Sequence, residues 1–205
     1  MTDRPEDGEL SRRQFLVASA VSAALAQSAS AQPGSPPGAA LSPARPIPRE
    51  GELLLHWTVN GQPQQVVIDP QLSLLEVLRE SLGLTSVRRG CEDGSCGSCT
   101  VLVDGKRVPS CLLWAALCQG KAITTVEGLS PDGELSPIQA AFIRHKASDC
   151  GFCTPGQVVA AHAILYEPWG PDEDSMQRSL CGQQCACGRR PQIAAAIAAV
   201  RSQRG

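Results

Sequence analysis

Ten cysteines stand out in the sequence, and three of them fall within the glycine-rich segment GCEDGSCGSC at residues 90–99. The spacing there is Cys91-x4-Cys96-x2-Cys99, and Cys111 follows at a distance. Four thiolates at this spacing can hold a [2Fe–2S] cluster, in which each iron takes two of them. The anionic cluster also favours a loop whose N–H groups turn inward, and glycines permit the positive φ angles of such a loop. We therefore predict an iron–sulfur site here, with Gly90, Gly94 and Gly97 at its turns.

Four further cysteines form two close pairs in the C-terminal part of the chain, Cys150-x2-Cys153 and Cys185-x-Cys187. One pair ends at Thr154-Pro155 and the other just before Pro191, and both prolines mark a helix start. A helix N-terminus presents free N–H groups and the positive end of the helix dipole. Two such ends aimed at one anionic centre predict a second cluster, rather than two unrelated structural thiol pairs.

The apolar patterns predict a sheet around the first cysteine segment. Strands are expected at 52–59, 65–68, 100–103 and 123–126, with turns at Asn60-Gly61 and Asp104-Gly105. A helix is expected over 73–82, because its apolar residues share one face and Ser73 is a suitable N-cap. This part of the chain is therefore predicted to be a small α+β ferredoxin-like domain.

The second half of the chain predicts helices instead of strands. Their expected starts are Ser136-Pro137, Thr154-Pro155, Asp174 and Arg190-Pro191. Three of the four have proline at the first helical position, and three have a good capping side chain just before the helix. A helical bundle is therefore expected to hold the second pair of cysteine segments.

The first thirty-one residues have the features of a signal peptide. The twin-arginine pattern Ser11-Arg12-Arg13-Gln14-Phe15-Leu16 precedes an apolar run over 15–26 and the small-residue site Ala29-Ser30-Ala31. That run is shorter than the roughly 20 residues needed to span a bilayer, and no membrane span is expected in the mature chain. Residues 32–50 are rich in proline and are expected to be a linker. The sequence therefore predicts a periplasmic protein, exported already folded.

Disulfides and zinc are the competing explanations for the thiols. An even number of cysteines in an exported chain ordinarily indicates a disulfide framework. Against it, Cys185 and Cys187 are too close in sequence for comfortable bridging, and twin-arginine export follows folding in the reducing cytoplasm. Either cysteine set could in principle bind zinc, but the spacing of the first favours iron.

The charge balance argues against a nucleic-acid partner. The chain has 18 Lys and Arg against 20 Asp and Glu, a net charge of −2. A basic surplus is the usual signature of nucleic-acid binding, and this chain has none. The three histidines, His56, His145 and His162, lie apart in the sequence and are expected to have ordinary core or surface roles.

Four stretches in this order resemble one known family: GCEDGSCGSCTVLVDG, SCLLWAAL with ITTVEGL, CGFCTPGQ, and CACGRRPQI. The chain from about 52 to 201 resembles the small iron–sulfur subunit of molybdenum hydroxylases, the xanthine dehydrogenase and aldehyde oxidase family. With its leader it is most similar to periplasmic aldehyde oxidoreductases whose iron–sulfur subunit is a separate chain. The resemblance implies a β-grasp ferredoxin domain, assigned to 51–129, and a four-helix bundle, assigned to 130–205, each with one [2Fe–2S] cluster.

The resemblance also implies the cluster ligands. Carried over by motif, they are Cys91, Cys96, Cys99 and Cys111 for the first cluster, and Cys150, Cys153, Cys185 and Cys187 for the second. Cys118 and Cys181 remain outside both sets. Cys118 is expected to be a small core hydrophobe, and a disulfide between these two is left open.

The family further implies a function and partners. A large molybdopterin-binding subunit hydroxylates an aldehyde or N-heterocycle with water, and electrons leave singly through the bundle cluster and then the ferredoxin-type cluster. They pass to FAD or another acceptor, so an FAD-binding or cytochrome c subunit is expected, and this chain is expected to contain no catalytic residue. A free-standing periplasmic two-cluster ferredoxin is the alternative function.

Two positions differ from the family's usual pattern. Asp149 stands where the family usually has a glutamine that contacts the pterin. The segment Cys185-Ala186-Cys187-Gly188-Arg189-Arg190 stands where the family typically has Cys-Arg-Cys-Thr-Gly-Tyr.

Overall fold

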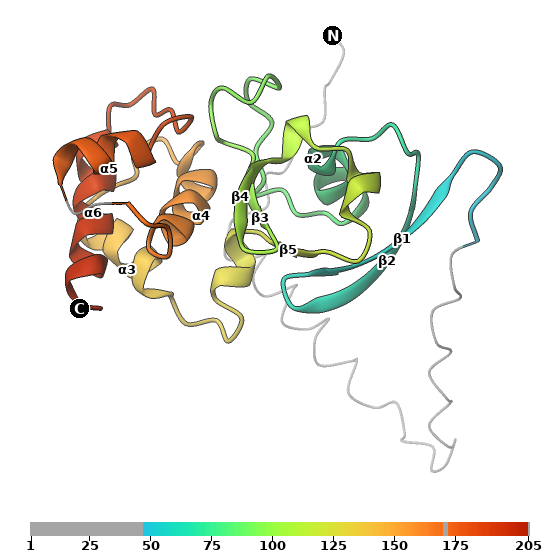
Figure 1. Cartoon of the computed structure of the whole chain (residues 1–205), viewed down its shortest axis with the longest axis horizontal. Helices are drawn as coiled ribbons and strands as arrows, with labels where there is room; N and C mark the ends of the chain where they lie inside the picture. The colour runs from blue at the N-terminus through green and yellow to red at the C-terminus, as the bar shows by residue number, and fades with distance from the viewer. Residues whose placement is uncertain (1–46, 170–171, 205) are drawn as a thin grey trace, which may run out of the picture. The chain divides into compact units, whose positions relative to one another are not determined.

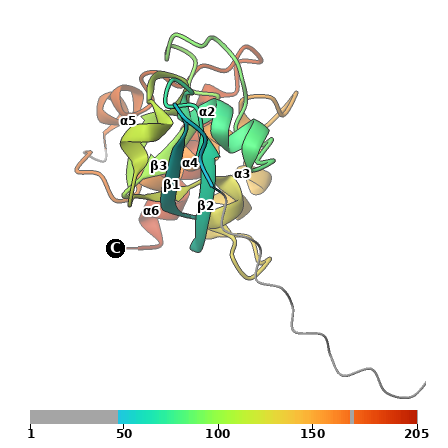
Figure 2. The same ribbon diagram turned by 90° about the vertical axis from the view of Figure 1, so that its right-hand side faces the viewer.

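Five strands form one mixed sheet in the order β2-β1-β5-β3-β4 (Figure 1). They are β1 (Leu53–Val59), β2 (Gln62–Ile68), β3 (Thr100–Val103), β4 (Lys106–Pro109) and β5 (Ala122–Thr124). β1 pairs antiparallel with β2 and parallel with β5, and β3 pairs antiparallel with β4 and β5. Figure 2 shows β1 and β2 side by side. This is the β-grasp arrangement, and it confirms the expected ferredoxin-like sheet.

The structure is a computed structural model that describes residues 47–169 and 172–204. The expected leader at 1–31 and most of the linker at 32–50 lie outside the described residues. The described residues belong to one compact unit, which spans Arg45–Gly205.

Both expected hairpin turns are present, but several strand boundaries differ from those expected, and β4 was not among the expected strands. β1 begins at Leu53 rather than 52, and β5 begins at Ala122 rather than 123. Asn60, Gly61, Asp104 and Gly105 all have positive φ, as two-residue hairpin turns of this type require. β2 begins at Gln62 rather than 65, because the tight turn lets pairing resume at once with Val59. β5 ends at Thr124 rather than 126. The N–H of Thr125 donates to Asn60 Oδ1 at 2.8 Å, and a short 3₁₀ turn, Val126–Leu129, follows.

The expected helix and its cap are confirmed. Helix α2 (Leu74–Glu76) continues into the π-helical turn η2 (Val77–Ser81). Ser73 Oγ accepts from the Glu76 N–H at 3.2 Å, and the Glu76 carboxylate accepts from the Ser73 N–H at 2.8 Å. The buried face of this helical segment joins sheet residues in the core of the domain, as Leu74, Leu75, Val77 and Leu78 with Leu55, Trp57, Val101 and Ile123.

The described residues of the second half form four helices: α3 (Pro137–Arg144), α4 (Thr154–Ile164), α5 (Glu173–Ser179) and α6 (Arg190–Ser202). Their shared core contains Ile138, Phe142, Ile164, Leu180, Ile193 and Ile197. The expected starts of α3, α4 and α6 are confirmed. α5 begins one residue before Asp174, because the Asp172 side chain caps it by accepting from the Ser175 N–H at 2.9 Å.

The expected cap of α4 was wrong. Thr154 is the first residue of the helix, and its hydroxyl pairs with that of Ser148 at 2.8 Å instead of capping the helix. The residue at the cap position is Cys153, and its side chain makes no capping hydrogen bond. The side chain at the cap position therefore accepts no hydrogen bond from the first N–H groups of α4.

The helices pack directly against the sheet. α4 contacts β3 and β4, and Leu102 of β3 packs with Val159 and Ala163 of α4. Arg107 of β4 pairs with Glu167, with Nη2 2.6 Å from Oε2, and its Nη1 donates to the Ser179 carbonyl at 2.8 Å. Apolar packing and a bidentate ion pair therefore join the two halves.

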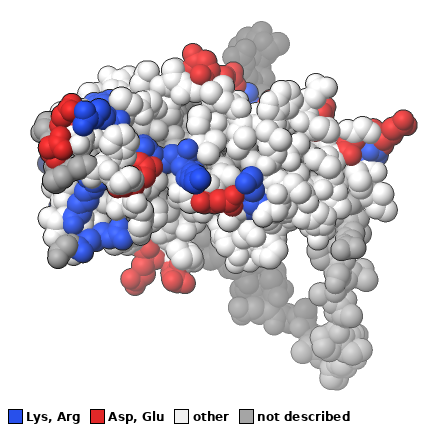
Figure 3. All heavy atoms as spheres, in the orientation of Figure 1, with Lys and Arg blue, Asp and Glu red and all other residues white. Residues whose placement is uncertain are grey.

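Charged residues of both signs share the face seen in Figure 3, where Lys and Arg lie in small groups beside Asp and Glu. No continuous basic surface of the kind that binds nucleic acid is visible on this face. Within the described part of the chain, no helix is both long enough and apolar enough to cross a membrane.

Candidate iron–sulfur sites

The first cysteine loop runs between η2 and β3, and its turns are only partly those expected. Gly94 and Gly97 have positive φ, of 80° and 74°, as predicted. The third left-handed position is Glu92, with φ 63°, and not Gly90. Gly90 is needed for space, since a Cβ there would lie 2.8 Å from Cys96 Sγ. The loop backbone thus passes closely around the sulfurs.

The four thiols of the first set are neighbours. The Cys96 N–H donates to Cys91 Sγ at 3.3 Å, and Cys99 and Cys111 share a hydrogen bond. Cys111 also lies close enough to Cys91 for the two thiols to interact electrostatically, and the Gly94 N–H donates a hydrogen bond to the Cys111 sulfur. The set therefore joins two thiol pairs, with backbone donors aimed at sulfur.

The two ends of this set differ in their electrostatic surroundings. A hydrogen bond with Asp93 raises the pKa of Cys91, but hydrogen bonds from Ser95 and Cys96 outweigh it and lower the pKa to about 7. Burial, followed by the neighbouring Cys99, raises the pKa of Cys111 to about 12. Cys91 thus lies in the more polar environment, and Cys111 in the drier one.

The second set lies where α4 and α6 begin. Cys153 is the N-cap residue of α4, and Cys185 and Cys187 precede Arg189, the N-cap residue of α6. Cys150 shares a hydrogen bond with Cys187, and Cys153 shares one with Cys185. The sequence-based expectation that both helix starts face one group of thiols agrees with this arrangement.

Backbone donors again reach the sulfurs. A hydrogen bond from the Phe152 N–H, followed by one from Cys187, lowers the pKa of Cys150. The Cys150 backbone bonds to Cys187, but the Cys150 thiol and the Asp149 charge outweigh it, and the pKa of Cys187 is raised. Burial, followed by the neighbouring Cys185, raises the pKa of Cys153 to about 12.

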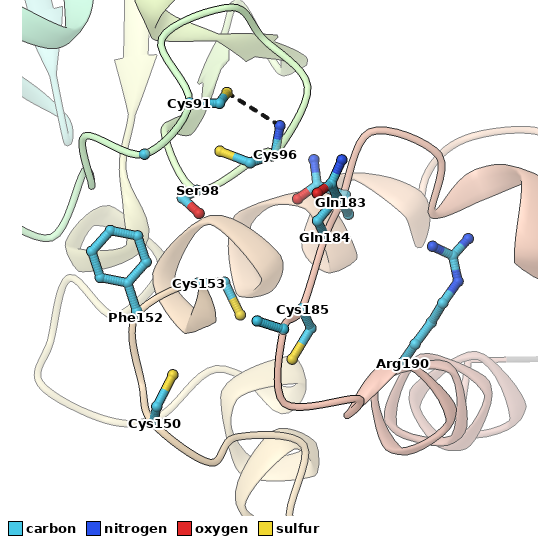
Figure 4. Close-up of a pocket in the computed structure, with 12 residues that line it drawn as sticks. Cys91, Cys96, Ser98, Cys150, Phe152, Cys153, Gln183, Gln184, Cys185 and Arg190 are labelled. Carbon is cyan, nitrogen blue, oxygen red and sulfur yellow. Dashed lines mark hydrogen bonds between the residues drawn. The ribbon is translucent and has the colours of Figure 1, made fainter.

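A cavity of about 520 Å³ lies between the two sets (Figure 4). Its lining includes Cys91 and Cys96 from the first set and Cys150, Cys153 and Cys185 from the second. In Figure 4 the sulfurs of Cys153 and Cys185 both project into the space between their segments. The cavity therefore brings parts of both sets to one place.

The donor chemistry fits two-iron clusters. Within 47–169 and 172–204, no group of three or more His, Cys, Asp or Glu side chains could hold a single metal ion. The thiols meet two by two instead, as Cys91 with Cys96 and Cys99 with Cys111, and as Cys150 with Cys187 and Cys153 with Cys185. A [2Fe–2S] cluster requires such pairs, because each of its irons takes two thiolates.

Two known domain families match consecutive segments of the chain. The family described as "2Fe-2S iron-sulfur cluster binding domain" matches residues 57–124, and that described as "[2Fe-2S] binding domain" matches residues 125–198. Two [2Fe–2S]-binding domains therefore follow one another in this chain.

Whole proteins are also similar to this chain. The aldehyde oxidoreductase iron-sulfur-binding subunit PaoA of Escherichia coli (strain K12) is 39% identical, over 94% of this chain and 89% of its own length. The nicotine 6-hydroxylase small subunit of Paenarthrobacter nicotinovorans is 45% identical, over 63% of this chain and 78% of its own. The crystal structure of quinoline 2-oxidoreductase from Pseudomonas putida 86 is similar with a TM-score of 0.71 and 40% identity, covering 76% of this chain and 98% of that one.

The chain belongs to the iron–sulfur subunits of the molybdenum hydroxylase family. It is an electron-transfer subunit of the aldehyde oxidoreductase and xanthine dehydrogenase type of enzyme, with two [2Fe–2S]-binding domains. The expectation drawn from its cysteine spacing and motif order is thereby confirmed.

A direct hydrogen bond connects the two cysteine loops of this iron–sulfur subunit. The Gln184 N–H donates to the Cys96 carbonyl at 2.9 Å, and the Gln184 side chain donates to the Ser95 carbonyl at 3.1 Å. Gln157, which is 1% exposed, donates in turn to the Gln184 carbonyl at 3.1 Å. These glutamines were not among the residues expected from the sequence, although the position of Gln184 directly before Cys185 was a usable signal.

Two glycines let the loops of the subunit approach this closely. A Cβ on Gly97 would lie 2.4 Å from the Gly182 carbonyl oxygen. A Cβ on Gly156 would lie 2.3 Å from the Gly97 carbonyl oxygen. Backbone atoms of the first loop therefore meet the second loop and α4 with no room for a side chain.

The two remaining cysteines are separate free thiols. Cys118 is fully buried in the core of the sheet domain, as expected for a small apolar residue. Cys181 is exposed just after α5, with its sulfur 4.0 Å from the Gln177 carbonyl. The disulfide left open between them is not formed in this structure.

The two positions that depart from the family pattern meet in the structure. Arg189 Nη2 lies 3.2 Å from Asp149 Oδ2. Asp149 directly precedes Cys150, and Arg189 follows two residues after Cys187. Both positions stand out in the sequence, but only the folded structure makes them partners.

Proposed function

We propose that the two thiol sets are the cluster ligands. Cys91, Cys96, Cys99 and Cys111 hold the first cluster, and Cys150, Cys153, Cys185 and Cys187 hold the second. The observation that carries this proposal is the pairing of all eight thiols, two by two, within two separate sets. When bound, each cluster supplies a carrier of one electron at a time.

The chain's own groups stabilise such centres by hydrogen bonding. The N–H groups of Cys96, Gly94, Phe152 and Cys150 point at sulfur, which favours anionic over neutral thiol ligands. The N-termini of α4 and α6 add partial positive charge at the second set. The burial of Cys99 and the partial burial of Cys153 limit the access of water.

The direction of electron flow is proposed from the resemblance to molybdenum hydroxylases. We propose that electrons enter at the second set, leave from the first, and cross between them where Gln184 bonds to Cys96. This covalent and hydrogen-bonded connection is short, since Gln184 adjoins Cys185 in the chain. Phe152 is 49% exposed beside Cys153, and it is an apolar group that a catalytic subunit would cover. Leu112 is 56% exposed beside Cys111, and it would lie where electrons leave the first set.

The partners are proposed from the family. PaoA, named as an aldehyde oxidoreductase subunit, is similar over nearly the whole chain. We propose that this chain likewise serves an aldehyde-oxidising enzyme, with a large molybdopterin-binding subunit and an FAD-binding or cytochrome c subunit as partners.

We propose export to the periplasm by the twin-arginine route. The support is the pattern Ser11-Arg12-Arg13-Gln14-Phe15-Leu16, followed by a short apolar run and a small-residue site. The similarity to PaoA covers 94% of the chain, so it extends into the first 31 residues.

Co-purification with the genomic neighbours tests the subunit assignment. The full chain, tagged and expressed with its neighbouring reading frames, should be purified with a molybdenum-containing chain in fixed ratio. The complex should oxidise aromatic or aliphatic aldehydes and should transfer electrons through this chain. A monomeric reddish-brown protein that associates with no molybdenum chain would instead support the free-standing ferredoxin.

A further inference from the structure

The exposed end of the second cysteine set holds an ion pair that bridges two chain segments. Cys150 and Cys187, which face each other, are both exposed, and the Asp149–Arg189 pair lies beside them. One member belongs to the segment before α4 and the other is the N-cap residue of α6. The pair therefore joins the same two segments that present Cys150 and Cys187.

Asp149 places a negative charge at the exposed end of the second set. It directly precedes Cys150, and its partner Arg189 lies two residues after Cys187. A lone carboxylate beside an anionic thiolate site is unfavourable, because like charges within a few ångströms repel. Arg189 offsets that repulsion, since its guanidinium is always charged.

Arg189 has a second feature that indicates a role here. Its Nε is buried and has no hydrogen-bond partner among the described residues. Buried donors are almost always paired in native proteins, so an unpaired one suggests an acceptor that the protein chain does not supply. An anionic group held by the neighbouring thiols would be such an acceptor.

We propose that Asp149 and Arg189 are positioning residues that clamp the Cys150 and Cys187 segments together and balance the charge at the exposed end of the second set. The proposal rests on the ligand assignment made above. Asp149 and Arg189 both differ from the usual family pattern, and this role gives a physical reason for the two residues to occur together.

Two measurements on the purified full chain test this proposal. The first is the midpoint potential of the second cluster, monitored by electron paramagnetic resonance. The second is the rate at which a chelator removes iron. Arg189→Gln leaves Asp149 uncompensated and should lower the potential, because a reduced cluster is more negative. Asp149→Asn should raise it. The double variant Asp149→Asn/Arg189→Gln and the conservative Arg189→Lys should stay close to the unmodified protein.

Iron release measures the clamp itself. Each single neutralising variant should release iron from the second set up to about fivefold faster, which corresponds to about 1 kcal/mol, the upper range for an exposed pair. Lys121→Gln is the matched control, because it breaks the similarly exposed Lys121–Asp104 pair, 2.9 Å long, whose residues belong to neither cysteine set. It should change neither the potential nor the release rate.

The outcomes separate this proposal from the one on which it rests. If the single variants shift the potential in the same direction, or leave potential and release unchanged while Cys150→Ser abolishes the second signal, the clamp is wrong and the ligands stand. If the second signal survives Cys150→Ser, the ligand assignment is wrong and the clamp falls with it.

Discussion

The backbone N–H of Gln184 donates to the carbonyl oxygen of Cys96 at 2.9 Å. Cys96 belongs to the first thiol set, and Gln184 is bonded to Cys185 of the second. Two segments almost ninety residues apart in the chain therefore touch at the positions where we propose that electrons cross. The contact depends on the close approach of backbones at Gly97 and Gly156, which makes it open to a direct test.

Gly156→Ala should push the loops apart. The added Cβ would lie 2.3 Å from the Gly97 carbonyl oxygen, and backbone atoms cannot swing away as a side-chain end can. Overpacking of this kind costs about 1–3 kcal/mol. Urea unfolding should therefore show a loss of that size, and stopped-flow reduction should show slower electron equilibration between the two clusters.

Two features make that result specific. Alanine is the better helix former by about 1 kcal/mol, so helix propensity alone would stabilise α4 and give the opposite sign. Gln184→Ala is the control, since it removes the side-chain bond to Ser95 but keeps the backbone N–H. It should cost about 0.5–1.5 kcal/mol and leave electron equilibration unchanged.

Metal content tests the ligand sets. The loaded protein should contain about four irons and four inorganic sulfides per chain and give two distinct paramagnetic signals, since hydrogen bonding and exposure tune each cluster separately. Cys185→Ser or Cys187→Ser should halve the iron and remove one signal. Cys181→Ser and Cys118→Ser should keep both signals, because Cys181 lies after α5 and Cys118 lies in the core of the sheet domain. Loss of iron in Cys181→Ser, with Cys185→Ser unaffected, would contradict the assignment.

The sequence predicted those features that depend on short chain segments. Cysteine spacing indicated two clusters, and the Asn60-Gly61 and Asp104-Gly105 turns were recognisable from local backbone preference. Helix starts at Pro137 and Arg190 were also visible, because proline and capping residues act within one turn.

Features that depend on packing between distant segments were not predictable. Gly90 was expected to supply a positive φ, but it supplies space for the Cys96 sulfur, and that is decided by the folded loop. The Gln184–Cys96 contact requires the sheet domain and the helices to dock in one particular way. The Asp149–Arg189 pair likewise joins residues forty positions apart.

Substitution of the twin arginines tests the proposed export route. Changing Arg12 and Arg13 together to lysine keeps the charge but removes the guanidinium groups of the twin-arginine pattern. The variant precursor should stay in the cytoplasm with its iron content intact, because export in the folded state requires the clusters to be inserted before transport. Cell fractionation with iron analysis measures this. Normal accumulation of that variant in the periplasm would show that residues 1–31 are not a twin-arginine leader.

The thiols outside the two sets should differ sharply in reactivity. Burial raises the pKa of Cys118 to about 11, and its side chain is fully buried. The thiolate is the form that reacts, and at this pKa only about one Cys118 thiol in a thousand would be ionised at pH 8. The surrounding packed side chains also keep the reagent away from Cys118. Cys181 is exposed. Iodoacetamide should therefore modify one thiol per folded, iron-loaded chain, and mass spectrometry should locate it at Cys181.

The pH dependence and the variants of this reaction separate accessibility from ionisation. Raising the pH from 8 to 9 should increase the thiolate fraction of Cys118 about tenfold, yet the folded protein should still leave Cys118 unmodified because the side chain stays buried. Cys181→Ser should abolish labelling of the folded chain, whereas both Cys118 and Cys181 should react after unfolding in urea. Rapid labelling of Cys118 in the folded, loaded protein would mean that the core of the sheet domain opens far more often than its packing around Cys118 implies.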